Sequence, residues 1–177
     1  MDKAGVGIVK ALEGLSLWGA TRAADMEMLD FGDRFTREFR TGPRTVGEYA
    51  LHLQSAWRIT SDGRVVVGAR DHWWPRSGVV DVDFDPDNLG STRRDELIVA
   101  FLAHGESAHR VKAAAIDDHP DLRLAFADGC ELEVWADIGG RKVQGEEAPA
   151  ECWRLFRCAV AGEPHLVCWA GGKTTLS

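Results

Sequence analysis

Two Asp-Gly turns constrain the fold of this chain more than any other feature. Asp62-Gly63 separates the apolar runs 57–60 and 64–68, and Asp128-Gly129 follows the alternating run 122–126. Asp-Gly between two such runs is typical of a tight β-hairpin. Further runs with strand character are 49–54, 111–116, 131–135, 152–156 and 166–169. The pattern therefore predicts mainly antiparallel sheet in both halves of the chain.

Two short helices complete the expected fold. Residues 6–13 carry apolar side chains at helical spacing and are followed by Gly14. A second helix begins at Ser91 or Thr92 as its N-cap and runs to His104-Gly105. We therefore expect an α+β protein with mainly antiparallel sheets, and a single compact domain over residues 1–177.

Composition limits the partners that the chain would bind. The chain is 45% hydrophobic and 28% charged, which predicts a folded protein, and its net charge is −7 with no basic half. This charge argues against nucleic-acid binding and against docking on an anionic membrane. No signal-like start and no apolar run of bilayer length is found, so we expect a cytoplasmic protein with reduced cysteines.

The two halves resemble each other in the order of their motifs. We align residues 6–75 with 92–172, so that Trp57-Arg58-Ile59 matches Trp153-Arg154-Leu155. Each unit would be a helix followed by a β-meander, and the whole an internal duplication. Generic strand patterning produces similar matches, so this alternative stays open. In either case we expect the indole side chains of Trp57 and Trp153 to anchor the core. We expect each arginine to reach carbonyls or a carboxylate across the seam between the two units.

Several metal- and phosphate-binding patterns are incomplete. Gly171-Gly172-Lys173-Thr174 lacks the earlier glycine and the following helix of a phosphate loop, and this tail is expected to fray. Asp81, Asp83, Asp85 and Asp87 alternate as in a calcium loop, but Pro86 occupies the turn position. We favour a strand with Val82 and Phe84 inward, and weak divalent-cation binding stays open. No metal site and no cofactor are predicted.

One local basic segment stands out in this acidic chain. Its four arginines are interleaved with two phenylalanines: Arg34, Phe35, Arg37, Phe39, Arg40 and Arg44. Such a segment could bind an anion or an acidic partner. We favour the simpler interpretation, a solvated hairpin or loop whose phenylalanines pack onto the core.

The densest polar and aromatic cluster is Arg70-Asp71-His72-Trp73-Trp74. Asp71 could orient His72, and the two indoles could wall a pocket. On a strand one of two adjacent tryptophans faces solvent, and an exposed tryptophan marks a contact surface more often than a catalytic site. These five residues are the candidate binding residues.

Four segments resemble a family of small uncharacterised bacterial proteins. They are residues 22–26 (Arg-Ala-Ala-Asp-Met), 47–52 (Gly-Glu-Tyr-Ala-Leu-His), Trp57-Arg58-Ile59 and Val67-Gly68 with Asp71. The resemblance covers most of the first half and less of the second. It implies no activity, cofactor or ligand.

Two functions of different classes follow from these observations. The first is a non-enzymatic interaction protein, immunity- or adaptor-like, that binds a protein partner or associates with itself. The second is a small-molecule-binding or hydrolytic enzyme with its site near Asp71, His72 and Trp74. A deep pocket that joins His72 to another titratable group would favour the enzyme, and an exposed apolar face would favour the interaction protein.

Overall fold

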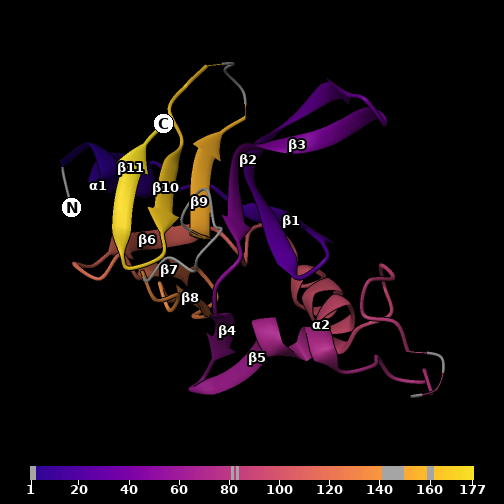
Figure 1. The fold of residues 1–177 in the computed structure, drawn as a ribbon. Helices are drawn as coiled ribbons and strands as arrows, with labels where there is room; N and C mark the ends of the chain where they lie inside the picture. Colours follow the sequence, from indigo (N-terminus) through magenta and orange to yellow (C-terminus); the bar gives the residue numbers. More distant parts are fainter. Residues whose placement is uncertain (1–2, 81, 83, 141–149, 159–161) are drawn as a thin grey trace.

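Eleven strands and two α-helices form from the described residues of the computed structural model, which are 3–80, 82, 84–140, 150–158 and 162–177 (Figure 1). All strand pairs are antiparallel and make two sheets. The first sheet contains, in spatial order, β1 (Leu17–Ala23), β2 (Met26–Phe39), β3 (Gly42–Leu53), β9 (Glu151–Arg157), β10 (Leu166–Trp169) and β11 (Lys173–Leu176). The second contains β5 (Arg64–Gly68), β4 (Trp57–Ser61), β8 (Glu131–Val134), β7 (Leu122–Phe126) and β6 (Val111–Ile116). The predicted class, mainly antiparallel with two short helices, is confirmed.

Local sequence explains where the helices begin and end. Thr92 caps α2 (Arg93–Leu102): its Oγ1 accepts the Asp95 backbone N–H at 3.1 Å, and the Asp95 carboxylate accepts the Thr92 backbone N–H at 3.1 Å. This reciprocal pair satisfies two N–H groups that the first helical turn leaves free. α1 (Lys3–Lys10) is followed by Gly14 at φ +88°, a conformation that glycine adopts without strain.

The chain changes sheet twice, and the two crossings tie its halves together. After β3 it crosses to β4 in the second sheet, and after β8 it crosses back to β9 in the first. The first half therefore gives β1–β3 to the first sheet and β4–β5 to the second. The second half gives β6–β8 to the second sheet and β9–β11 to the first. The halves meet where β3 pairs with β9 and where β4 pairs with β8. This order follows the alignment of 6–75 with 92–172, although a shared origin of the halves stays a prediction.

One apolar core lies between the sheets and receives residues from both halves. Trp57 and Trp153 are both buried in it, as expected of anchors. Arg58 reaches across the seam and donates from Nε to the Glu133 carboxylate at 2.7 Å, whereas Arg154 pairs with Glu151 on its own strand. The Trp-Arg pairs are thus structural elements, and only the first arginine spans the seam.

Three local expectations are corrected. The described residues of 79–84 form no strand, and Val82 is 91% exposed rather than turned inward. The segment 33–44 lies in the β2–β3 hairpin, as expected, but Phe35 and Phe39 are 38% and 45% exposed instead of packed on the core. The C-terminal tail does not fray, because β11 pairs with β10 from Lys173 to Leu176.

Candidate functional site

Four of the five predicted site residues lie on a short 3-10 helix, η1 (Ala69–Trp73), that follows β5, and Trp74 comes directly after this helix. The Asp71 carboxylate accepts the Gly68 backbone N–H at 2.9 Å and so fixes the chain reversal at the start of this helix. Arg93 Nε lies 3.4 Å from the other Asp71 carboxylate oxygen. Asp71 therefore holds η1 to β5 and to α2, and it does not orient His72 as the sequence suggested.

His72 lies beneath this surface. Only 1% of the surface of His72 is exposed, and its Nδ1 is buried without a hydrogen-bond partner. Burial lowers the pKa of this imidazole, and the positive charges of Arg94 and Arg22 lower it further. The buried ring packs against Trp73 in an edge-on arrangement, with 4.7 Å between ring centroids, and is thus placed to support the tryptophan.

Trp73 and Trp74 are both exposed, at 60% and 62% of their surface. The expectation that one of them faces inward assumed a strand, and the end of a 3-10 helix turns both outward. The chain around them is fixed, because the Trp74 carbonyl accepts the Arg93 backbone N–H at 2.7 Å. The two indole side chains are thus exposed to solvent on a backbone that is fixed by hydrogen bonds.

A shallow hollow of about 250 Å³ opens beside Trp73. Its lining includes one predicted site residue besides Trp73, which is Arg70, and seven others: Asp25, Gln54, Ser55, Ala56, Ala69, Asp137 and Ile138. Trp74 and His72 do not line it. The structure thus brings Arg70 and Trp73 to one hollow, and places Asp71, His72 and Trp74 outside it.

A buried network of charges joins this region to the first sheet. Arg22 donates to both carboxylate oxygens of Asp95, at 2.7 and 2.9 Å, and Arg94 Nε lies 3.2 Å from the Glu27 carboxylate. Arg94 also donates to the Asp25 carbonyl at 2.8 Å. These bonds hold the start of α2 against the β1–β2 turn, and α2 in turn holds η1.

Sequence reasoning missed this network, although the spacing of Arg94 contains a signal. Arg94, Ile98 and Phe101 follow the i, i+4, i+7 pattern of one helix face, and all three are buried. Because long charged residues are rarely buried without a partner, an arginine on the apolar face predicts a buried carboxylate nearby. That carboxylate is Glu27, which is 2% exposed.

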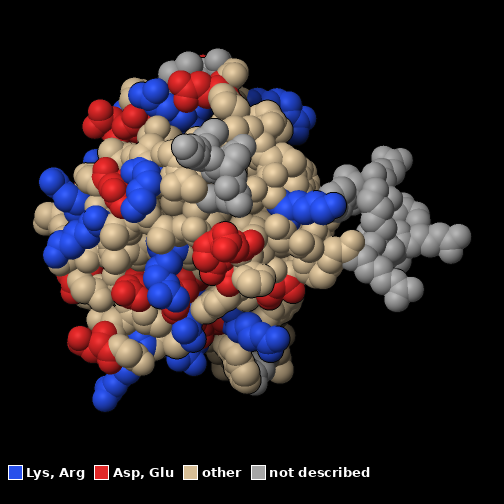
Figure 2. Space-filling view, turned by 90° about the vertical axis from the view of Figure 1, so that its left-hand side faces the viewer, with Lys and Arg blue, Asp and Glu red and all other residues tan. Residues whose placement is uncertain are grey.

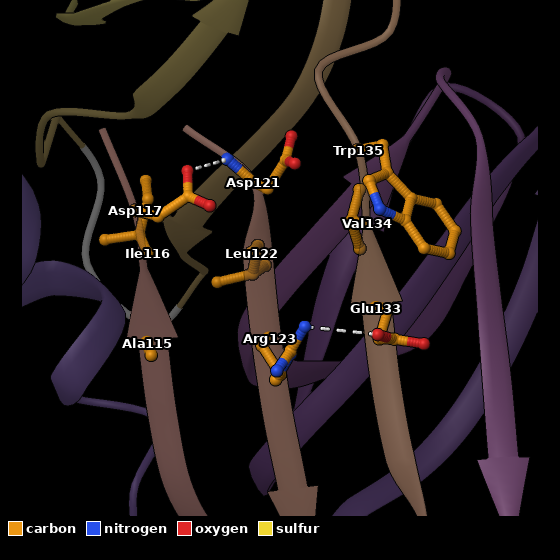
Figure 3. A pocket seen from close by; sticks show the side chains of 9 residues that line it. All are labelled: Ala115, Ile116, Asp117, Asp121, Leu122, Arg123, Glu133, Val134 and Trp135. Carbon is orange, nitrogen blue, oxygen red and sulfur yellow. Dashed lines mark hydrogen bonds and ion pairs between the residues drawn. The ribbon is translucent and has the colours of Figure 1, made fainter. Parts of the chain in front are cut away.

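A second hollow, of about 240 Å³, lies at one end of β6, β7 and β8 (Figure 3). Asp117 accepts the Asp121 backbone N–H at 3.1 Å, and Arg123 lies 3.3 Å from Glu133. Asp121 in turn accepts the Ala136 backbone N–H at 2.8 Å. These charged groups are occupied by turn and cross-strand contacts, which account for their positions without a ligand.

The described residues contain no group of three His, Cys, Asp or Glu side chains arranged to hold a metal ion. Asp81 and Asp83 of the calcium-like segment lie outside the described residues, and Asp85 accepts the Asp87 backbone N–H at 3.0 Å. No helix in the described part of the chain is long and apolar enough to span a bilayer. Comparison with family models, with curated proteins and with solved structures finds no match.

Proposed function

We propose that this protein is a non-enzymatic binding protein that contacts a protein partner through the surface around Trp73 and Trp74. The observation that carries the proposal is the exposure of both indoles on an ordered backbone. Exposing this much aromatic surface to water is unfavourable, and tryptophan is the residue most enriched among the energetic centres of protein interfaces.

The surroundings of the two indoles indicate the chemistry of the partner. Arg93 lies next to Trp74, since its backbone N–H donates to the Trp74 carbonyl, and Arg70 lines the hollow beside Trp73. Asp71 pairs with Arg93, and Asp25 and Asp137 line the hollow together with Arg70, so carboxylates border the indoles as well. We expect a partner that presents an apolar side chain to the indoles and carboxylates to Arg70 and Arg93.

The enzymatic alternative has less support. An enzyme that used His72 would need its imidazole in contact with substrate, and this residue is 1% exposed. The hollow beside Trp73 does not include His72 in its lining. A catalytic histidine would instead open onto the pocket and pair with a group that orients it.

Defined peptides test the proposal. We would measure the affinity of 12-residue peptides with a central Trp, Phe or Leu that is flanked by Glu, and of matched peptides flanked by Lys. The Glu-flanked set should bind, and the double variant Trp73→Ala/Trp74→Ala should weaken binding by ~30-fold, the loss typical of an interface centre. Val65→Ala is the control, because Val65 is an exposed apolar residue on β5.

Three outcomes would overturn the proposal. The first is tighter binding of the Lys-flanked peptides, and the second is equal affinity of the double variant and the wild type. The third is a dimer in sedimentation that disappears in the double variant, because the indoles would then be covered by a second copy of this chain.

A further inference from the structure

The tip of the β2–β3 hairpin extends beyond its neighbouring strands (Figure 1). β1 pairs with β2 only as far as Phe31, and β9 pairs with β3 only from Tyr49 onward. Between these limits, residues 34–39 of β2 pair with residues 42–47 of β3 alone among the described strands. We call these two segments the arm, and both of its outer backbone edges lack a strand partner in the described part of the chain.

One face of the arm combines arginine with exposed aromatic side chains. Side chains alternate along a strand, so Phe35, Arg37 and Phe39 share a face with their register partners on β3. The partner of Arg37 is Arg44, directly opposite it across the ladder. This face therefore carries two facing guanidinium groups with an exposed phenyl ring on each side of them.

Two like charges directly opposite each other destabilise an antiparallel pair. Arg37 donates to the Cys158 carbonyl at 3.2 Å, and the Arg44 guanidinium lies 5.9 Å from the centre of the Phe39 ring. Neither arginine is paired with a carboxylate in the described residues. No carboxylate in the described residues therefore offsets the repulsion between these two charges, whereas a carboxylate between them would turn the repulsion into attraction.

We propose that the arm binds an acidic, extended segment of a partner protein, which adds as a strand to one of its free edges. Strand addition uses the unpaired N–H and C=O groups of an edge, and alternate side chains of the added strand give specificity. Carboxylates on the added strand would meet Arg37 and Arg44, and apolar side chains would cover Phe35 and Phe39. This goes beyond the proposed function, because the arm and η1 lie at opposite ends of the molecule (Figure 1).

The charge of the chain favours an acidic protein over a nucleic acid. The segment 33–47 contains four arginines and two acidic residues, while the rest of the chain contains 17 basic and 26 acidic residues. On the face seen in Figure 2, Lys and Arg are interspersed with Asp and Glu and form no continuous basic track. A polyanion would be repelled outside the arm, whereas a short segment with a few carboxylates meets only the arm.

A ten-residue peptide in which every second residue is Thr, and the residues between alternate Val and Glu (the Val-Glu peptide), tests the proposal because it presents Val and Glu on the same face. The matched Val-Lys peptide and a ten-nucleotide oligothymidylate are the competitors. The Val-Glu peptide should bind and slow the amide hydrogen exchange of residues 33–47. Arg44→Gln/Phe39→Ser should weaken it by at least about tenfold, and Arg64→Gln on β5 is the control. The Arg44→Gln variant alone should have a urea midpoint no lower than that of the wild type, since it removes a repulsion.

The Trp73→Ala/Trp74→Ala variant should bind the Val-Glu peptide as the wild type does, which separates this inference from the proposed function. The inference is overturned if the peptide binds without slowing exchange in the arm, or if Arg64→Gln weakens it as much as Arg44→Gln/Phe39→Ser. Tighter binding of the Val-Lys peptide or of oligothymidylate overturns it as well.

Discussion

Trp57 and Trp153 occupy matched positions in the two sheets. Each lies directly across the ladder from the last residue of a strand after which the chain crosses to the other sheet. Trp57 pairs with Val134 at the end of β8, and Trp153 pairs with Leu53 at the end of β3. The two indoles differ in one respect. Trp153 Nε1 donates to the Pro120 carbonyl at 3.0 Å, while Trp57 Nε1 is buried without a partner.

This difference predicts the result of two pairs of substitutions. Trp57→Ala and Trp153→Ala should each lower the free energy of unfolding by about 3–5 kcal/mol, because each leaves a large cavity. Trp57→Phe should cost less than Trp153→Phe, because only the second loses a hydrogen bond and leaves a buried carbonyl unpaired. Urea unfolding measures all four values. Near-zero losses for both alanine variants, with the fold intact, would contradict the role of these residues as core anchors.

Turns and helix starts could be predicted from the sequence where they depend on residues close together in the chain. Asp62-Gly63 gives the β4–β5 turn and Thr92 gives the start of α2, because each depends on bonds within a few residues. The alternation at 79–84 was misleading, since a strand needs a neighbour to pair with, and the described residues there have none. Strand β11 escaped prediction for the converse reason, because its pairing with β10 is a tertiary contact.

The candidate site could also be predicted only in part, because its exposed residues form a local cluster in the sequence whereas their burial depends on the folded backbone. The sequence identifies Arg70 to Trp74 as a polar and aromatic cluster, and the structure places Trp73 and Trp74 at the surface. The side-chain bond from Asp71 to the Gly68 backbone turns this segment into a 3-10 helix and hides His72. A Gly-x-x-Asp spacing after a strand is a signal that could have indicated this turn.

Stability should depend on pH through Glu27. Burial raises the pKa of this carboxyl group to about 7, although Arg94 and Arg22 act in the opposite direction. The folded-state pKa thus lies above the usual value of 4.5, so the folded state takes up the proton first. The stability that this group contributes is present at low pH and is lost as the pH rises through about 7.

Glu27→Gln isolates this effect. Relative to the variant, the wild type should gain roughly 3 kcal/mol in free energy of unfolding as the pH falls from 8 to 4.5, from the shift in pKa. Urea unfolding of both proteins at several pH values measures the gap. Parallel curves over this range would show that Glu27 titrates at its ordinary pKa.

His72 should be dispensable for binding. Because it is buried beneath Trp73, His72→Phe should keep the fold and should bind the Glu-flanked peptides within about threefold of the wild type. Circular dichroism and peptide titration check the two halves of this expectation. A folded variant that no longer binds would give the imidazole a direct role and would favour the small-molecule alternative.

The four cysteines should be unreactive in the folded protein. All four are buried, and burial raises the pKa of the Cys158 thiol to about 11 and that of Cys168 to about 12. Since the thiolate is the reactive form, a thiol-specific disulfide reagent at pH 8 should modify them only on unfolding. Fast modification of any one cysteine in native protein would identify an accessible, activated thiol and contradict this expectation.

The most direct test of the central claim is fluorine NMR of protein that contains 5-fluorotryptophan at its seven tryptophans. Trp→Phe variants at 73 and 74 assign the two exposed signals. On addition of a Glu-flanked peptide, we expect the signals of Trp73 and Trp74 to shift, while those of buried Trp57 and Trp153 stay in place. A titration in which bound peptide leaves both exposed signals unchanged would contradict the assignment of this surface as the binding site.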